Sequence, residues 1–358
     1  MDDAAALALL EGALDIPSPS GQEGPVARWL VERMSSAGFD RAEVDAAGNA
    51  VGVMGDGPRQ LVLLGHIDTV PGVVPRRRAG DLIHGRGAVD AKGPFAAFVA
   101  GAARAGRRPG WSVVVVGAVE EEAPTSKGAR HAAGQWRPEA CVIGEPSGWD
   151  ALTLGYKGRL LVEYRLERGL AHSAGPERAP PEHGVAFWNA LAARAEAENA
   201  GREAAFERVS PALLRFETPT DGLAQRVELA VSIRTPLGFD SAAWREALGR
   251  AAADPEVGGG ATLTFLGEEV AWRAGKNTAL VRAFLAAIRA GDGRPGFKVK
   301  TGTSDMNVVG PAWRCPILAY GPGDSRLDHT PDEHVSAAEY LRGVAVVHGA
   351  IERFTASP

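Results

Sequence analysis

Short apolar segments that alternate with helical segments are the feature of this sequence that most constrains its fold. Three of them are rich in Val, Leu and Ile: LVLLGHID at residues 61–68, WSVVVVGAV at 111–119 and EACVIGEP at 139–146. Continuous apolar runs of this length suit strands that are buried on both faces, as in a mostly parallel sheet. Residues 94–106 and 126–136, which lie between these runs, have the composition of crossover helices. The first 156 residues are therefore expected to form a doubly wound α/β domain.

The pattern of the sequence changes after Tyr156. Residues 158–169 and 226–236 alternate apolar and polar side chains, which is typical of half-exposed antiparallel strands. From residue 277 onward the α/β rhythm returns. A length of 358 residues is also large for a single hydrophobic core.

These changes indicate that one domain is inserted into another. We predict a mostly parallel, doubly wound catalytic domain formed by residues 1–156 and 270–358. The inserted domain, residues 157–269, is predicted to be α+β.

Composition and charge narrow the class of protein. A formal net charge of −5 argues against nucleic-acid binding, and no apolar run approaches the ~20 residues needed to cross a membrane. The first residues carry two acids where a secretory signal would carry basic residues. The two cysteines, Cys141 and Cys315, lie in apolar runs and are predicted to be buried free thiols. Together these features indicate a cytoplasmic protein.

Residues that can bind metal ions follow the apolar runs. They are His66 and Asp68 after the first run, Asp90 in the glycine-rich loop Gly85–Gly93, Glu120–Glu122 after the second run, Glu145 after the third, and His329 near the end. Ligand sites in open α/β sheets lie at the carboxyl ends of the strands. Two histidines, a bridging aspartate and two more carboxylates suffice for two divalent ions about 3.5–4 Å apart, which activate a water and polarise a carbonyl. One of the adjacent glutamates could take the proton of that water.

Each of these residues also has an interpretation that needs no metal. The triple Glu could be a solvated helix face, Asp90 a helix N-cap, and His66 a core histidine. The histidines outside these motifs are interpreted as packing, surface or capping residues: His84, His131, His183, His334 and His348. The recurrence of ligand types after successive strands favours a metal site.

Several motifs together resemble those of a known family. GHIDTVPG, GRGAVDAKG, the Glu pair before APTSKGAR, GEPS and DHTPDEH occur in the order of the signatures of the M20 zinc peptidases and deacylases. The resemblance covers nearly the whole chain. It implies a hydrolase of linear amide bonds that uses two divalent ions, zinc or cobalt. It also implies that residues 157–269 are a lid and dimerisation domain, and that the protein is a homodimer.

The resemblance assigns a role to each ligand. His66 and Glu145 would bind one ion, Glu122 and His329 the other, and Asp90 would bridge both. Glu121 would be the general base, and Asp68 would orient a neighbouring group. The family's Glu pair is placed at Glu121 and Glu122 because five residues then separate it from Gly128; a register one residue earlier, starting at Glu120, is the alternative.

Further roles follow for the inserted domain and the late loop. His172, in Gly169–Ser173, would stabilise the oxyanion of the tetrahedral intermediate, and Arg234 would hold a substrate carboxylate. Gly302, Thr303 and Ser304 would line the substrate pocket. The alternatives are a loop histidine, a strand-end salt bridge for Arg234, and a turn with a helix cap at residues 302–305.

Within the family, the chain resembles most closely the hydrolases that act on an amino-group carrier protein. VEEEAPTSKGARHA, GEPSGWDALTLGYKGRL and KTGTSDMNVVGPAW carry this resemblance. It implies release of lysine or ornithine from the C-terminal glutamate of a small acidic carrier, in lysine or arginine biosynthesis. The run Arg76–Arg78 could dock such a carrier, or could be a solvated basic loop.

Three other functions remain as alternatives. The first is a small-molecule deacylase that acts on acetylornithine, succinyl-diaminopimelate or acetyl-lysine with the same catalytic residues. The second is an aminopeptidase without a lid, which the insertion disfavours. The third is a non-catalytic protein on this scaffold, which the presence of Glu121 and His172 disfavours.

Overall fold

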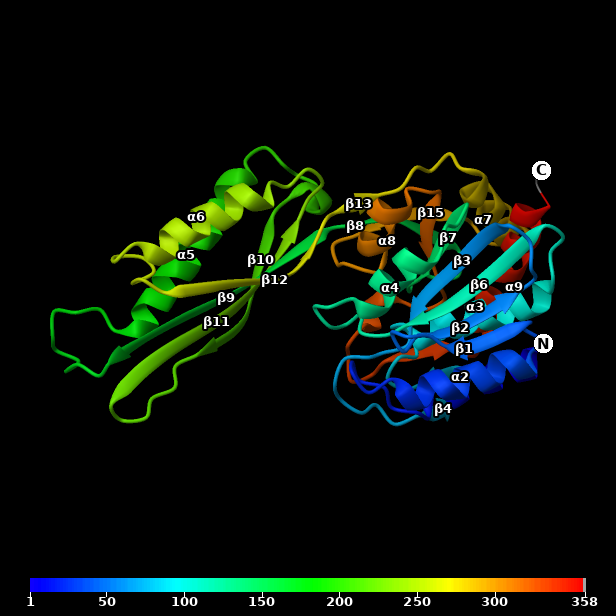
Figure 1. Ribbon diagram of the computed structural model, residues 1–358, viewed down its shortest axis with the longest axis horizontal. Coiled ribbons are helices and arrows are strands. Elements are labelled where there is room, and N and C mark those ends of the chain that lie inside the picture. The colour runs from blue at the N-terminus through cyan, green and yellow to red at the C-terminus, as the bar shows by residue number, and fades with distance from the viewer. Residues whose placement is uncertain (357–358) are drawn as a thin grey trace. The chain divides into compact units, whose positions relative to one another are not determined.

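The computed structural model describes residues 1–356, and its contacts divide the chain into two compact units (Figure 1). The first unit contains Met1–Gly155, Arg273–Val299 and the chain from Ser304 onward. The second contains Tyr156–Trp272 and Lys300–Thr303. The catalytic and lid roles of these parts stay predictions, because contacts define compact units and not their functions. Within residues 1–356, every helix is too short or too polar to span a membrane.

The first unit is built on one large sheet whose four central strands, β6, β3, β7 and β15, are parallel. Its strands are β1 (Arg41–Val44), β2 (Ala50–Met54), β3 (Arg59–His66), β6 (Trp111–Ala118), β7 (Ala140–Gly144), β8 (Ala151–Tyr156), β13 (Trp272–Arg273), β14 (Gly296–Lys300) and β15 (Ile317–Tyr320). Antiparallel strands flank the parallel centre on both sides. The predicted mostly parallel α/β fold is therefore confirmed.

Helices cover both faces of this sheet (Figure 1). They are α1 (Asp3–Leu14), α2 (Gly24–Ser36), α3 (Lys92–Ala105), α4 (Lys127–Gln135), α7 (Ala279–Ala290), α8 (Met306–Trp313) and α9 (Ala337–Thr355). α3 packs against β3, β6 and β7, and α7 and α9 extend the same layer, whereas α4 and α8 pack on each other.

Glycines in the central strands let α3 lie close to the sheet. A Cβ atom on Gly117 would come within 2.9 Å of the ring of Phe95, and one on Gly144 within 3.0 Å of the ring of Phe98. Protein interiors are close-packed, so larger residues at these two positions would push the helix away. The start of α3, and the loop before it, are thereby held near the sheet edge.

A separate three-stranded antiparallel sheet completes the first unit. It consists of β4 (Arg77–Ala79), β5 (Leu82–His84) and β16 (His334–Ser336), with β5 in the middle. The short helical turn η2 (Ser325–Leu327) comes shortly before β16. The strand that precedes Asp90 is β5, so Asp90, unlike His66 and Glu145, does not follow a strand of the large sheet. Asp90 reaches its position through the loop that enters α3.

The second unit is a four-stranded antiparallel sheet with two helices on one face (Figure 1). Its elements are β9 (Gly158–Gly169), β10 (Ser210–Glu217), β11 (Ala224–Thr235), β12 (Thr262–Glu269), α5 (Pro180–Glu198), α6 (Ser241–Ala253) and the turn η1 (Ala205–Glu207). Trp244 of α6 and Phe187 of α5 are buried in a core of this unit's own. An independent core explains why the alternating pattern of β9 and β11 differs from the continuous apolar runs of the first unit.

Both cysteines are free, as predicted. Cys141 in β7 is buried, and Cys315 just before β15 is half-buried. Burial raises the pKa of the Cys141 thiol well above its ordinary value and that of Cys315 to about 11. The raised pKa values favour the protonated thiol, which is the less reactive form.

Candidate metal centre

His66 and Asp90 meet at the carboxyl edge of the large sheet. His66 is the last residue of β3 and is 1% exposed. Its Nδ1 lies 3.0 Å from the backbone oxygen of Asp68, and its Nε2 lies 3.0 Å from Oδ1 of Asp90. A proton on Nδ1 that is donated to the backbone oxygen leaves the lone pair of Nε2 facing the carboxylate. A metal-binding histidine commonly has this arrangement, because the second ring nitrogen is held by a hydrogen bond.

His329 joins the same cluster from the end of the chain. Its Nε2 lies 2.9 Å from Oδ2 of Asp90 and 2.8 Å from Oε1 of Glu122. His329 has a φ of 62°, in the left-handed region that residues other than glycine rarely adopt. The two oxygens of Asp90 therefore point to two different histidines. A carboxylate in this position can bridge two ions.

The charges of this cluster depend on one another. Hydrogen bonds to Asp90 and Glu122 raise the pKa of His329 to about 10. Burial alone would raise the pKa of Asp90, yet His329 and His66 lower it. In the absence of a cation, the neighbouring carboxylates raise the pKa of His66 as well, against the effect of burial, so they favour the protonated form of both histidines. The same nitrogens and oxygens are suited to a divalent metal ion, whose binding would displace these protons.

Asp68 positions the glutamate pair. Its buried carboxylate accepts hydrogen bonds from the backbone N–H of Glu121 (3.0 Å) and of Glu122 (3.1 Å). The hydroxyl of Ser20 donates a third hydrogen bond to it, at 2.7 Å. Asp68 thus fixes the backbone that carries the two glutamates, and it also lies beside His66.

Glu121 and Glu145 complete the acidic side of the cluster. Burial raises the pKa of Glu121 well above its ordinary value, and the charges of Glu122, Asp305 and Glu145 raise it further. Glu145 is buried directly after β7, at the same sheet edge. A carboxyl group with a raised pKa is suited to accept and return a proton near neutral pH.

Two of the three metal-free interpretations of this region, those for the triple Glu and for Asp90, fit the structure poorly, whereas a buried and hydrogen-bonded His66 fits a core histidine as well as a ligand. Glu120, Glu121 and Glu122 lie in a loop between β6 and α4, so they do not form a helix face. The N-cap of α3 is Ala91, and Asp90 makes no capping hydrogen bond. The side chain of Glu120 accepts an exposed hydrogen bond from the hydroxyl of Thr125. Its surroundings therefore differ from those of Glu121 and Glu122, which lie beside the cluster.

Glu333 is a residue of this region that the sequence analysis missed. Its buried Oε1 accepts hydrogen bonds from the backbone N–H groups of Gly87, Val89 and Asp90, and its Oε2 accepts from Arg86 at 2.9 Å. Glu333 therefore holds the loop that presents Asp90. A signal was available, because a glycine-rich loop leaves backbone N–H groups that need an acceptor.

The predicted substrate-binding residues include one contacting pair. Nη1 of Arg234, in β11, donates a hydrogen bond of 2.8 Å to Oγ1 of Thr303. Gly302 is half-buried beside them. Ser304 is buried, and its Oγ accepts from the backbone N–H of Met306 at the start of α8, which matches the alternative of a turn at a helix start.

His172 lies in the second unit, in the segment that follows β9. The residue is exposed, and its Nδ1 accepts a hydrogen bond of 3.1 Å from the backbone N–H of Ala174. With Nδ1 as the acceptor, a neutral imidazole carries its proton on Nε2, which can then donate to another group. The oxyanion role of His172 stays a prediction.

The arginine run is paired with acids of the same chain. Arg76 contacts Asp15 at 2.5 Å, Arg78 contacts Glu11 at 3.0 Å, and Arg77 lies 3.7 Å from Asp332. Surface pairs of this kind contribute little to stability but neutralise the local field. The interpretation as a basic surface loop is favoured over a dedicated docking site for an acidic protein.

Comparison with known proteins supports a single family. Residues 62–353 match the profile of Peptidase family M20/M25/M40. A protein of Deinococcus radiodurans named [LysW]-lysine hydrolase is 47% identical over 364 residues, which cover 98% of this chain and 98% of the relative. The [LysW]-lysine/[LysW]-ornithine hydrolase of Saccharolobus solfataricus is 28% identical, with 96% of this chain and 94% of the relative covered.

Solved structures are similar in fold. The M20 family metallo-carboxypeptidase Sso-CP2 of Sulfolobus solfataricus superposes with a TM-score of 0.81 at 18% identity, covering 99% of this chain and all of the other. The di-peptidase Dug1p of Saccharomyces cerevisiae superposes with a TM-score of 0.78 at 15% identity, covering 99% and 96%. At these identities the likeness concerns the fold alone.

Proposed function

The chain belongs to peptidase family M20/M25/M40, and on this premise we propose that it releases lysine or ornithine from the C-terminal glutamate of a LysW-type carrier protein. The observation that carries this proposal is the 47% identity, over almost the full length of both chains, to a relative with that named activity. Full-length coverage matters because the similarity then includes both compact units. The expected place of the reaction is biosynthesis of lysine or arginine.

Two divalent ions, zinc or cobalt, fit the residues of the candidate metal centre. His66 and Glu145 would hold one ion, Glu122 and His329 the other, and Asp90 both. The fit rests on two imidazole nitrogens that lie within 3.0 Å of carboxylate oxygens of Asp90 in a largely buried cluster. When bound, such ions lower the pKa of a water molecule and polarise the scissile carbonyl.

Protons in the proposed reaction move through Glu121. Its carboxylate takes a proton from the attacking water and returns it to the leaving amine of lysine. Asp68 keeps Glu121 in place through the backbone hydrogen bond at 3.0 Å. The rate therefore depends on Asp68 through position, although Asp68 itself exchanges no proton.

The second unit would supply substrate contacts. His172 would donate a hydrogen bond to the oxyanion, and Arg234 would hold a carboxylate of the substrate. Gly302, Thr303 and Ser304 would line the substrate pocket, with Ser304 contributed by the first unit. Two copies of the chain would form a homodimer, with His172 serving the partner's centre. The free thiols Cys141 and Cys315 are compatible with a cytoplasmic enzyme.

The test compares two substrates on the same zinc- or cobalt-loaded protein: LysW-type carrier linked to lysine, and acetylornithine. Release of free lysine from the carrier, lost in a Glu121→Gln variant, is the expected result. Release from acetylornithine alone would replace the proposal with small-molecule deacylation. A parallel assay with carrier-linked ornithine ranks the two amino acids, which differ by one methylene and hence by only about 1–3 kcal/mol in binding.

A further inference from the structure

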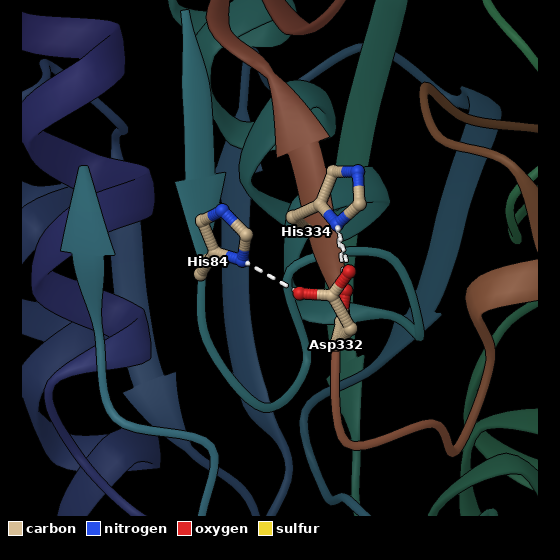
Figure 2. Close-up of side chains that lie close together, drawn as sticks. All are labelled: His84, Asp332 and His334. Carbon is tan, nitrogen blue, oxygen red and sulfur yellow. Dashed lines mark hydrogen bonds and ion pairs between the residues drawn. The ribbon is translucent and has the colours of Figure 1, made fainter. Parts of the chain in front are cut away.

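A second histidine–carboxylate cluster lies in the small antiparallel sheet of the first unit (Figure 2). His84 ends β5 and His334 begins β16, and the two residues are directly paired across these strands. Their ring centroids are 4.8 Å apart. Asp332 points its carboxylate at both rings: Oδ1 is 3.3 Å from Nδ1 of His84, and Oδ2 is 3.8 Å from Nδ1 of His334.

These three side chains form a donor set for a transition-metal ion. Zinc binds imidazole nitrogen and carboxylate oxygen at about 2.0–2.2 Å, which places the donors of one tetrahedral site about 3.3 Å apart. One donor atom from each of His84, Asp332 and His334 lies within 4.8 Å of the other two. Small side-chain rotations would bring these donors to coordinating distance. Since Asp332 is exposed, water can complete the coordination.

His84 has its lone pair available at neutral pH. Burial, with the charges of Arg77 and His334, lowers the pKa of His84 below its ordinary value of 6.5. A neutral imidazole is the form that binds metals. The residue is 5% exposed, so its ring has little freedom to turn away.

In the metal-free chain, the guanidinium of Arg77 contacts the same nitrogen of His84 that would bind the metal ion. Arg77 is paired with His84 across β4 and β5, and its Nη2 donates a hydrogen bond of 3.1 Å to Nδ1 of His84. Its side chain is 58% exposed, so the guanidinium can move into solvent. Nδ1 of His334 lies 2.6 Å from the backbone oxygen of Asp332, so its proton must shift to Nε2 when a metal binds. Both changes weaken binding without blocking it.

We propose that His84, Asp332 and His334 bind one zinc-like divalent ion, at a site separate from the candidate metal centre, in exchange for the Arg77 guanidinium. The site has a structural consequence for that centre. β5 leads directly into the loop that presents Asp90, and the segment that carries His329 leads directly into β16. An ion held by His84 and His334 therefore clamps together the two segments that present these ligands. The two sites share no side chain.

The test counts zinc ions per chain after equilibrium dialysis against Zn²⁺. The full-length protein is compared with His84→Gln and His334→Gln, and with His348→Gln as a matched control. His348 lies on α9 beside Glu352 and away from the cluster. The two cluster variants should each hold one ion fewer than wild type, while His348→Gln holds the wild-type number. Equal numbers in all four proteins overturn the proposal.

Two additional variants separate this site from the candidate metal centre. In a His66→Gln background, His84→Gln should still remove one ion; if it removes none, the lost ion belongs to the other centre and the proposal is wrong. Arg77→Ala should tighten zinc binding at this site about tenfold, because a competing cation is gone. Weaker binding in Arg77→Ala would contradict the exchange. If the buried substitution His84→Gln prevents folding, the His334→Gln variant still tests the proposal, because His334 is only half-buried.

Discussion

The two histidine–carboxylate clusters of the first unit use the same residue types in different surroundings. At the candidate metal centre, His66 is buried at the end of a central strand, and a buried carboxylate of Asp68 fixes the neighbouring glutamates. The cluster of His84, Asp332 and His334 lies in a short three-stranded sheet, and its only carboxylate is exposed. One cluster is surrounded by fixed hydrogen bonds, and the other is open to solvent.

Burial and the number of neighbouring carboxylates distinguish a centre that is suited to chemistry from one that is suited to a structural ion. In the first cluster, burial changes the pKa values of several coupled groups and leaves Glu121 beside them as a base. In the second, the charged groups that act on His84 are Arg77, His334 and Asp332, and Asp332 is itself a proposed ligand. We therefore expect chemistry at the first cluster only, and a stabilising ion at the second.

The largest effect is expected for the proposed base. Glu121→Gln should lower kcat by at least about 10³-fold with unchanged zinc content, because the amide cannot take the proton of water. Steady-state release of lysine measures it. Glu120→Gln is the matched control, since Glu120 accepts from Thr125 at the surface, and it should change kcat by less than about threefold. The opposite ranking would move the base to the earlier register.

The second-largest effect is expected for Asp90, whose carboxylate contacts both His66 and His329. Asp90→Asn is expected to weaken zinc binding at the candidate centre by more than about 100-fold, because both histidines lose their shared partner. Asp332→Asn should remove the surface ion and lower kcat by at most about threefold, because only the clamp on the two ligand-bearing segments is lost. Zinc content and kcat are measured on both proteins. Loss of turnover in Asp332→Asn would show that the second cluster takes part in the reaction.

A smaller effect is expected for the residue that holds the Asp90 loop. Glu333→Gln should weaken zinc binding about 10–100-fold, because the neutral amide oxygen is a weaker acceptor for three backbone N–H groups and for Arg86. Glu339→Gln is a matched control: its carboxylate also accepts two backbone N–H groups, from Trp149 and Gly323. Equal losses of zinc affinity in both variants would mean that the effect is general destabilisation.

The smallest effect is a pH dependence of stability with opposite signs in the two clusters of the metal-free chain. His329 has its folded-state pKa raised to about 10 from 6.5, so its contribution is complete below pH 6.5 and is lost as the pH rises towards 10. His84 has its pKa lowered from 6.5, so protonation of the unfolded chain reduces stability as the pH falls below 6.5.

Denaturant unfolding of the metal-free chain between about pH 5 and pH 10 measures both effects. His329→Gln should remove the loss at high pH, which is at most about 1 kcal/mol because half of that side chain is exposed and screened. His84→Gln should remove the loss at low pH. Identical pH profiles for wild type and both variants would contradict the contacts and burial assigned to His329 and His84.

Local patterns explain why many strands of both units were predictable. The buried parallel strands β3, β6 and β7 coincide with the continuous apolar runs, and the alternating β9 and β11 coincide with the predicted antiparallel strands. The edge strand β10 was not predicted, because many of its side chains are exposed on both faces and show no clean alternation.

Three features could be read from the sequence alone: the alternation of strands and helices, the residue types after each buried run, and the order of the family motifs. These are local properties, set by side-chain periodicity and by the chemistry of neighbouring residues. Three contacts became known only from the tertiary structure: Glu333 with the Asp90 loop, Arg76 and Arg78 with acids in and just after α1, and His84 with His334. Each of these contacts joins segments far apart in the chain, about 240 residues for the Glu333 hydrogen bonds, and no local pattern specifies such pairs.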